Sequence, residues 1–360
     1  MSLSPFDHPF LSGLFGDAEV AAQFSAEADI AAMVRFERAL ALAEAECGVL
    51  DADIATAIDA GLAGFSPDMA GLADGVANDG VVVPALVRQM RAAVGGPAGE
   101  KVHFGATSQD VIDTSLILRL KAATEGLDVR LADVIGDLDG LLERDGSRLL
   151  MGHTRMQAAI DIHAGDRLGA WRAPLERTRS RLALFAVDGF AVQFGGAAGT
   201  LERFGDAGPS VRAALASRLG LSDRAQWHSQ RDAMAEFAGL LSLVTGSLGK
   251  VGQDIALLAQ AGGEISLAGG GGSSAMPHKQ NPVAAELLVT LARFNAVQIS
   301  ALHQSLVHEQ ERSGAAWMLE WMTLPPMVMA TATALRTAHR LFGDLRRIGR
   351  EPGEAGDHLN

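Results

Sequence analysis

The chain has 360 residues, 48% of them hydrophobic and 20% charged, with a formal net charge of −13. A chain of this length can bury a large core, and its negative charge argues against general binding to nucleic acid or to an anionic membrane. Cys47 is the only cysteine, which excludes a disulfide framework and a cysteine zinc site. Residues 1–16 lack a signal-peptide pattern, and no uninterrupted apolar run reaches the roughly 20 residues of a membrane span. We therefore expect a soluble cytoplasmic protein with no membrane or nucleic-acid partner.

The N-terminal part of the chain predicts several short helices. Apolar residues recur at helical spacing across residues 28–47. Residues 51–62 and 85–94 predict two more helices, with a loop expected at 76–84. The stretch 95–105 then carries four glycines and one proline, which is typical of a domain boundary.

Longer helices are predicted in the rest of the chain, at residues 110–124, 127–144, 158–183, 232–260 and 283–306. The helix at 232–260 would be about 43 Å long at 1.5 Å per residue, and it is apolar on most of its faces. Such a helix is usually buried on all sides, and one chain offers few neighbours to surround it. We therefore expect an all-α fold, an elongated helical-bundle subunit whose central bundle is completed by other subunits. The sequence shows no convincing strand pattern and no internal repeat.

These elements divide the chain into three regions. Residues 1–104 form an N-terminal helical domain, residues 105–342 a central domain of long helices with a loop at 262–282, and residues 343–360 a short polar tail. The segments that suggest chemistry all lie beside the long helices of the central region.

The first such segment is residues 101–114, KVHFGATSQDVIDT. Thr107 and Ser108 precede a predicted helix, and small hydroxyls with free backbone N–H groups at a helix start make an anion site. The alternative is an ordinary helix cap at Thr107 or Ser108, with Asp110 as the acid of the first turn. His103, taken alone, is more typical of a structural histidine.

The second segment is residues 152–158, GHTRMQA, which gathers His153, Arg155 and Gln157 ahead of a predicted helix. A polar loop with a helix cap explains this composition as well as a binding site does. A metal site is a weak interpretation, because His153 and His163 are ten positions apart and no HExxH pairing is present. We therefore expect no metal.

The third segment is residues 269–282, GGGGSSAMPHKQNP. Glycines cost backbone entropy and bury nothing, so a run of them ahead of hydroxyl, cationic and amide groups suggests a loop that closes over an anion. A P-loop is excluded because Lys279 follows His278 and no Ser or Thr comes next, and no βαβ unit supports a dinucleotide fingerprint. A plain linker would not need Met276, Lys279 and Asn281 in a fixed order.

These three segments, in this order, resemble the conserved regions of the fumarase/aspartase superfamily. GSSAMPHKQNP is similar to its signature, roughly GSSxMPxKxNP, and HFGATSQDVIDT to the first region of its adenylosuccinate-lyase-like branch. GHTRMQ stands where the second region, usually GRTHxQ, is expected. The resemblance extends from about Gly13 to about Met327.

Three further stretches resemble the cycloisomerases of this superfamily, which close a tricarboxylate diene to a lactone in aromatic catabolism. They are SGLFGD at 12–17, SQRDAMAEFAGLL from position 229 and HEQERSGAAWMLEW at 308–321. The resemblance implies an all-α homotetramer in which each active site takes the three segments from different subunits. It implies a small tricarboxylate substrate and no cofactor.

The resemblance also implies roles for single residues. Ser273 would be the acid or base at the carbon next to a carboxylate, with Ser274 as the neighbour that sequence alone does not separate from it. Lys279 and Asn281 would hold the activating carboxylate. His103 would orient or protonate the substrate. The remaining substrate-binding positions are Thr107, Ser108, His153, Arg155, Gln157, Met276 and Arg312.

Two departures from the family pattern bear on the substrate. Arg155 stands where lyases carry the histidine that helps protonate a leaving group; a carboxylate with a pKa of about 4 leaves without a proton, and a cation suits a tricarboxylate. Trp321 stands where adenylosuccinate lyases carry a phosphate-binding arginine. Both favour a cycloisomerase over the alternative, an adenylosuccinate-like or other C–N lyase that releases a fumarate-type product.

Ser273, Lys279 and Asn281 argue against a non-enzymatic homologue such as a lens crystallin. Many members continue into a further helical domain, which we expect to be reduced or absent here.

Overall fold

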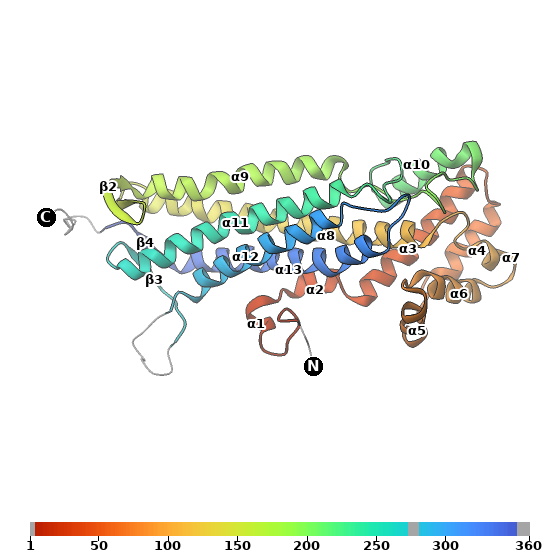
Figure 1. The fold of residues 1–360 in the computed structure, drawn as a ribbon, viewed down its shortest axis with the longest axis horizontal. Coiled ribbons are helices and arrows are strands. Elements are labelled where there is room, and N and C mark those ends of the chain that lie inside the picture. The colour runs from red at the N-terminus through yellow and green to blue at the C-terminus, as the bar shows by residue number, and fades with distance from the viewer. Residues whose placement is uncertain (1–3, 273–280, 351–360) are drawn as a thin grey trace.

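Five long helices run side by side along the molecule in a computed structural model, which describes residues 4–272 and 281–350 (Figure 1). They are α8 (Ser108–Asp145), α9 (Ala164–Asp188), α11 (Asp232–Ala261), α12 (Val283–Gln304) and α13 (Ala315–Asp344). The four short strands of the described residues lie at one end of this bundle. The predicted all-α helical-bundle fold is confirmed.

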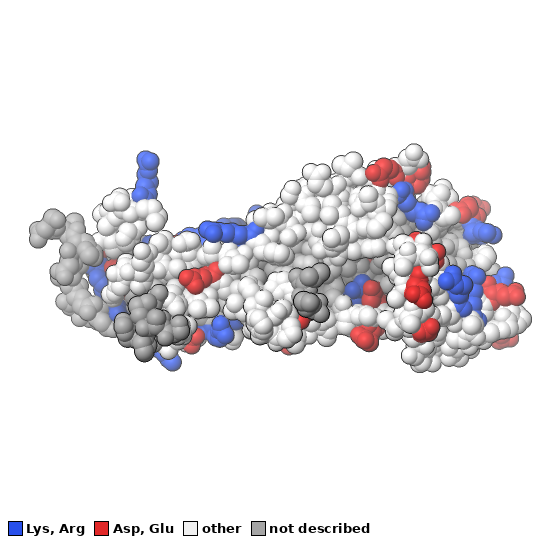
Figure 2. All heavy atoms as spheres, turned by 60° about the horizontal axis from the view of Figure 1, so that its bottom comes forward, with Lys and Arg blue, Asp and Glu red and all other residues white. Residues whose placement is uncertain are grey.

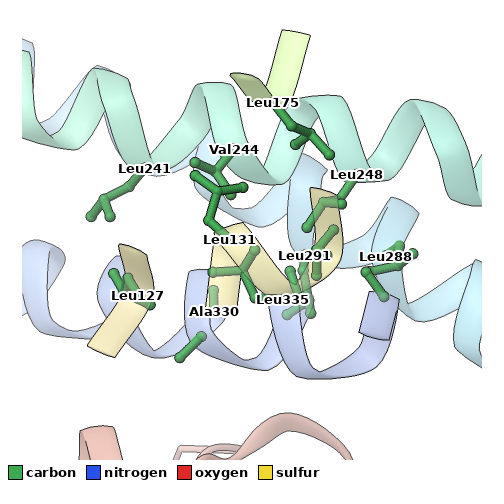
Figure 3. Packing of buried hydrophobic residues seen from close by; sticks show 14 of the residues in the cluster. Leu127, Leu131, Leu175, Leu241, Val244, Leu248, Leu288, Leu291, Ala330 and Leu335 are labelled. Atoms are coloured by element: carbon green, nitrogen blue, oxygen red, sulfur yellow. The ribbon is translucent and has the colours of Figure 1, made fainter. Parts of the chain in front are cut away.

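Aliphatic side chains hold the long helices together, and Figure 3 shows this core from close by. Leu131 of α8, Leu175 of α9, Leu248 of α11, Leu291 of α12 and Leu335 of α13 are all buried in it. Each such side chain stabilises the fold by about 1.5–3 kcal/mol relative to an exposed one. The apolar residues that recur along the sequence therefore pack together in one continuous core.

A second core joins the shorter N-terminal helices from residue 26 onward to α10 (Gly208–Leu219) and to the start of α8, whereas Val20 lies in the first core. The shorter elements are α1 (Ser12–Phe15), α2 (Ala18–Gln23), α3 (Ala26–Glu46), α4 (Ala52–Leu62), α5 (Met69–Asp79), α6 (Val83–Val94), α7 (Gly96–Lys101) and the 3₁₀ turn η1 (Gly205–Ala207). Four of these helices begin where a side-chain oxygen accepts a backbone N–H, at Asp17, Ser25, Asp51 and Asp68. This second core forms the end of the molecule opposite the strands (Figure 1).

α8 is longer than the sequence analysis predicts. Its 38 residues include both predicted helices, at 110–124 and 127–144, and the glycine between them, Gly126. A glycine inside a helix costs about 1 kcal/mol, and the burial of Leu127 and Leu131 just beyond it outweighs that cost. At about 1.5 Å per residue, α8 spans roughly 57 Å, so its two ends lie far apart.

Two stretches that we expect to be loops contain helical turns. α5 runs to Asp79 and α6 begins at Val83, so the loop expected at 76–84 is only a short turn. α7 likewise lies inside the boundary expected at 95–105. In α6 and in α7 a proline occupies the first turn, where its missing N–H costs no hydrogen bond. These prolines therefore mark helix starts rather than loops.

The expectation of no strands is wrong for the residues after α8. β1 (Leu149–Thr154) and β2 (Gln157–His163) pair as an antiparallel hairpin, and α9 begins only after it, at Ala164. Arg155 and Met156 form the two-residue turn, with φ of 48° and 66°. Positive φ at both central positions matches the twist of the strands. Arginine and methionine do not favour that conformation, so the sequence carries no turn signal here.

A second pair of strands, β3 (Ile265–Leu267) and β4 (Leu345–Ile348), lies at the same end of the bundle. β4 falls in the stretch that the sequence predicts as a polar tail, yet its first and last residues are fully buried. α13 leads into β4 and has no counterpart among the predicted helices. It contains a Pro-Pro pair at 325–326, which ordinarily interrupts a helix.

Among the described helices, α12 is long and apolar enough, by length and composition alone, to cross a membrane. Its most apolar stretch has a mean hydropathy of 1.2, and only 28% of that stretch is buried. α12 packs against α11 and α13 within the bundle. Val297 on its outer face is 70% exposed, so one chain leaves part of this apolar helix uncovered.

Candidate active site

The first predicted segment forms the start of α8. Thr107 is the N-cap residue, and its backbone N–H donates to the Asp110 side chain over 3.0 Å. The Thr107 hydroxyl belongs to the same capping box and also accepts a hydrogen bond from Arg312 Nη1 over 2.6 Å. Ser108 follows as the first helical residue and is half-buried. Thr107 is therefore both the helix cap and a candidate substrate-binding residue. Arg312, from the loop between α12 and α13, lies beside it.

Asp110 ties this helix start to the chain around Gly195. Its carboxylate is fully buried and accepts the backbone N–H groups of Gly195 and Gly196 over 2.9 and 3.0 Å. The ring Nε2 of His228 lies 2.8 Å from the same carboxylate. These bonds use the oxygens of Asp110 within the protein, so this acid fixes the position of the helix start and does not face a substrate.

His103 lies on the turn just before the start of α8. Its φ is 66°, and Gly105 has φ of 68° with no room for a Cβ, which would lie 2.3 Å from the Phe204 ring. His103 Nδ1 lies 2.6 Å from Oε1 of Glu37, a residue of α3. Burial lowers the pKa of His103, but the Glu37 carboxylate, together with the charge of Asp110, holds this pKa above its ordinary value. His103 also lines a cavity of about 320 Å³.

A fully buried ion-pair cluster centred on Arg231 lies next to the first turns of α8. The guanidinium donates to Asp113 of α8 over 2.7 and 3.1 Å, and to Glu320 of α13 over 2.8 and 2.5 Å. Trp317 Nε1 donates to the same Asp113 carboxylate over 2.8 Å. Because Arg231 directly precedes α11, the cluster fixes α8, α11 and α13 relative to one another at this level.

The second predicted segment lies on the hairpin that follows the other end of α8, and its side chains are exposed. His153 Nδ1 lies 3.2 Å from the carbonyl oxygen of Met151, and Gln157 Nε2 donates to the carbonyl of Met156 over 3.1 Å. Arg155 has no side-chain hydrogen bond to any other residue that the structure describes. These groups therefore face outward from a single chain.

The third segment lies partly outside the described residues. Ser273, Ser274, Met276 and Lys279 lie outside the described residues. Asn281 lies inside them, and it exchanges backbone hydrogen bonds of 2.8 and 2.9 Å with Gly271. Its side-chain amide also donates to the carbonyl of Gly272 over 3.4 Å. The two chain stretches that flank residues 273–280 are therefore joined.

The structure brings the second and third segments to one end of the bundle and the first to the other (Figure 1). The backbone N–H of Met151 donates to the Glu264 side chain over 2.8 Å, which links β1 to the residues that lead into the glycine segment. The start of α8 lies a full helix length away. One chain therefore gathers His103, Thr107, Ser108 and Arg312 at one end, and His153, Arg155, Gln157 and Asn281 at the other.

Sequence reasoning missed Glu37 and the Arg231 cluster. Glu37 does leave a signal, because it falls with Met33, Leu40 and Glu44 on the buried face of α3, where an acid is unusual. Arg231 lies in a stretch that carries the family resemblance, but nothing there indicates its partners, which lie 118 and 89 positions away in the sequence. Across residues 4–272 and 281–350, no group of three or more side chains is arranged to hold a metal ion.

A bundle of long helices, with the first segment at one end and the second at the other, agrees with the resemblance to lyases of the fumarase/aspartase type. The sequence profile of the lyase family matches residues 8–297, and the chain belongs to this family.

Several of the known proteins to which the chain is similar share one name. The chain is 41% identical over 343 residues to the 3-carboxy-cis,cis-muconate cycloisomerase of Pseudomonas aeruginosa. The aligned region covers 92% of this chain and 74% of that protein. It is 37% identical over 335 residues to the enzyme of that name from Bradyrhizobium diazoefficiens, over 91% of this chain and 74% of that one. The crystal structure of 3-carboxy-cis,cis-muconate lactonizing enzyme from Pseudomonas putida matches with a TM-score of 0.87 and 34% identity, over 94% of this chain and 77% of that one. These relatives favour the cycloisomerase prediction over the C–N lyase alternative.

Proposed function

We propose that the protein is a cycloisomerase that closes 3-carboxy-cis,cis-muconate to 4-carboxymuconolactone. The observation that carries this proposal is the 41% identity, over 92% of the chain, to a cycloisomerase acting on that muconate. The replacement of the lyase histidine by Arg155 supports it, because lactone formation needs no protonated leaving group and a tricarboxylate needs cations.

The proposed chemistry is an intramolecular addition. One carboxylate oxygen of the substrate attacks a carbon of the conjugated alkene, so that the C–O bond forms while the π electrons move toward the neighbouring carbon. The Ser273 hydroxyl gives its proton to that carbon and later regains one from solvent. Holding the carboxylate against the alkene supplies much of the rate advantage. Charge that develops beside a second carboxylate requires fixed donors and cations.

The polar residues of the three segments divide this work. Lys279 and Asn281 hold the carboxylate next to the carbon that is protonated, and Arg155 supplies a second cation. Thr107 and Arg312 bind further substrate oxygens at the start of α8, where the helix dipole and free N–H groups favour an anion. His103 orients or protonates the substrate.

We propose further that the active sites form between subunits of a cytoplasmic homotetramer. Leu184 and Val187 of α9, Val297 of α12 and Met322 of α13 are 70–77% exposed on the long helices. On the face shown in Figure 2, the middle of the molecule carries few charged side chains, whereas charges gather at the end of the N-terminal helices. Covering apolar faces with other copies contributes about 25 cal/mol per Å². It would also bring the helix start of one subunit to the hairpin and glycine segment of others.

The experiment that tests this function is a spectrophotometric assay of the purified protein with 3-carboxy-cis,cis-muconate, without added metal or cofactor. Loss of the diene absorbance, with the lactone identified by NMR, is the expected result. An unchanged absorbance together with release of fumarate from adenylosuccinate or argininosuccinate would replace the cycloisomerase by the lyase alternative. Light scattering on the same sample measures the number of subunits.

A further inference from the structure

Glu37 is a buried acid with a single partner. Its side chain is fully buried, Oε1 lies 2.6 Å from His103 Nδ1, and Oε2 has no hydrogen-bond partner among the described residues. A buried carboxylate with unused acceptor capacity costs free energy. Its neighbours on this face of α3, Met33 and Leu40, are apolar and buried, and an apolar residue would suit packing there equally well. Packing therefore does not account for an acid at this position.

Glu44 lies on the same face of α3, two turns further along. It is also buried, and its Oε1 has no hydrogen-bond partner within the described residues. Burial, together with the charge of Glu37, raises the pKa of Glu44 to about 9. At neutral pH Glu44 is therefore uncharged, and the acid that acts on His103 is Glu37.

We propose that Glu37 is a positioning residue for His103. It accepts a hydrogen bond from the Nδ1–H group, which fixes the ring and directs Nε2, the remaining nitrogen, to the cavity that His103 lines. The left-handed backbone of His103 agrees with this role, because such strain persists where the surroundings hold a residue in place. The inference rests on the proposed function, since it concerns what His103 does in that reaction.

Charged groups from several elements surround the ring. They are Glu37 of α3, Arg91 of α6, Glu100 of α7, Asp110 of α8, and the exposed pair Glu202 and Arg203. Of these, only Glu37 lies within hydrogen-bond distance of the His103 ring in the described structure. Removing its charge should therefore change the ring more than removing any of the others.

The substitution Glu37→Gln keeps the size of the side chain and removes its charge. We would follow the titration of His103 by NMR in the full-length oligomer with ¹³C-labelled histidine, assigning its signal by its loss in His103→Asn. The pKa of His103 should fall by about 1–3 units in Glu37→Gln. Glu44→Gln is the matched control, because it changes an uncharged glutamate of the same helix in the same way. It should leave this pKa within about half a unit.

Activity provides the second readout. The kcat for cyclisation should fall about 10–100-fold in Glu37→Gln, with a small change in KM and a pH profile that moves with the ring. Glu37→Asp keeps the charge, so it should retain the raised pKa and lose less activity, and it serves as the test if Glu37→Gln does not fold. The proposal would be overturned by an unchanged pKa of His103 in Glu37→Gln, by an equal change of this pKa in Glu44→Gln, or by an unchanged pH profile of activity in Glu37→Gln. If the unmodified protein does not convert the muconate, the proposed function fails, while the NMR titration still decides whether Glu37 controls His103.

Discussion

Arg312 and Thr107 lie 205 positions apart in the sequence, yet Arg312 Nη1 donates a hydrogen bond to Thr107 Oγ1 over 2.6 Å. The contact joins the loop between α12 and α13 to the N-cap of α8. It places a guanidinium beside the backbone N–H groups of a helix start, a combination that attracts an anion. Neither residue signals this partnership in its local sequence, although the family resemblance implies a substrate-binding role for both.

Replacing Arg312 by alanine should therefore weaken substrate capture without unfolding the protein. A hydrogen bond to a charged group contributes about 1.5–3 kcal/mol, so kcat/KM for the muconate should fall about 10–100-fold. Arg88→Ala, at an exposed position of α6, is the control and should leave kcat/KM unchanged. Wild-type steady-state kinetics in Arg312→Ala would remove this residue from the substrate site.

The Arg231 cluster should be essential for stability. Arg231→Met leaves Asp113 and Glu320 buried without their cation, so the free energy of unfolding should fall by about 3–5 kcal/mol. Denaturant titration followed by circular dichroism measures the loss. Arg218→Met removes an exposed arginine from its pair with Glu46 and should cost no more than about 1 kcal/mol. If both variants lost the same free energy of unfolding, burial would not be the reason that the Arg231 ion pairs matter for stability.

Glu44 should make the protein less stable as the pH rises. Its pKa in the folded protein is about 9, against an ordinary value of about 4.3 for an unfolded glutamate. Between these values the folded state binds more protons than the unfolded state, so this group's favourable contribution is complete below the lower pKa and declines toward the higher one. The slope is at most about 1.4 kcal/mol per pH unit.

Glu44→Gln removes this titration, so the melting temperature of the variant should gain on that of the unmodified protein as the pH rises from 5 to 9. Both proteins are compared by thermal denaturation in the same series of buffers. A difference in melting temperature that does not grow with pH would show that Glu44 is not the group responsible.

The sequence predicts those parts of the fold that depend on local pattern. α11 and α3 match their predicted ranges closely because apolar residues recur along them at helical spacing. The hairpin after α8 escapes prediction because its turn uses Arg155 and Met156 in a conformation that glycine or asparagine normally occupies. α13 escapes because packing in the bundle core outweighs a Pro-Pro pair.

The candidate site divides in the same way. Thr107 and Ser108 can be found from the small hydroxyls at a predicted helix start, since that signal lies within a few residues. The pairing of His103 with Glu37 cannot, because the two lie 66 positions apart and meet only when α3 packs against the turn before α8. Motifs therefore indicate which residues act, and tertiary packing determines what holds them.

Ser273→Ala should reduce turnover by about 10²–10⁴-fold if this hydroxyl supplies the proton. Its neighbour offers a control within the same segment, so Ser274→Ala should retain more activity. Near-normal turnover in Ser273→Ala would exclude that residue as the acid, and loss in Ser274→Ala alone would transfer the role to Ser274. Gel filtration should show the same oligomer for both variants.

Arg155→His restores the residue type of the lyases at the turn of the hairpin. It removes the permanent cation proposed for a tricarboxylate, so cyclisation should slow, with the loss largest above the ordinary pKa range of histidine, where the new side chain is neutral. The pH profile of kcat/KM checks this directly. A variant that cyclises the muconate at the normal rate at pH 8 would show that no cation is needed at this position.

Because the two ends of α8 lie far apart, we expect that oligomers mixed from two inactive variants regain activity. Ser273→Ala damages the glycine segment, whereas the double substitution Thr107→Val with Arg312→Ala damages the start of α8, and each variant alone should be nearly inactive. If one site combines these segments from different subunits, co-expression of the two variants should restore activity, because about a quarter of the sites would receive both segments unmodified. Two samples purified separately and mixed without subunit exchange form the control and should stay inactive. Co-expressed oligomers that show no recovery would mean that each site is built within one subunit, against the roughly 57 Å that a 38-residue helix places between its ends.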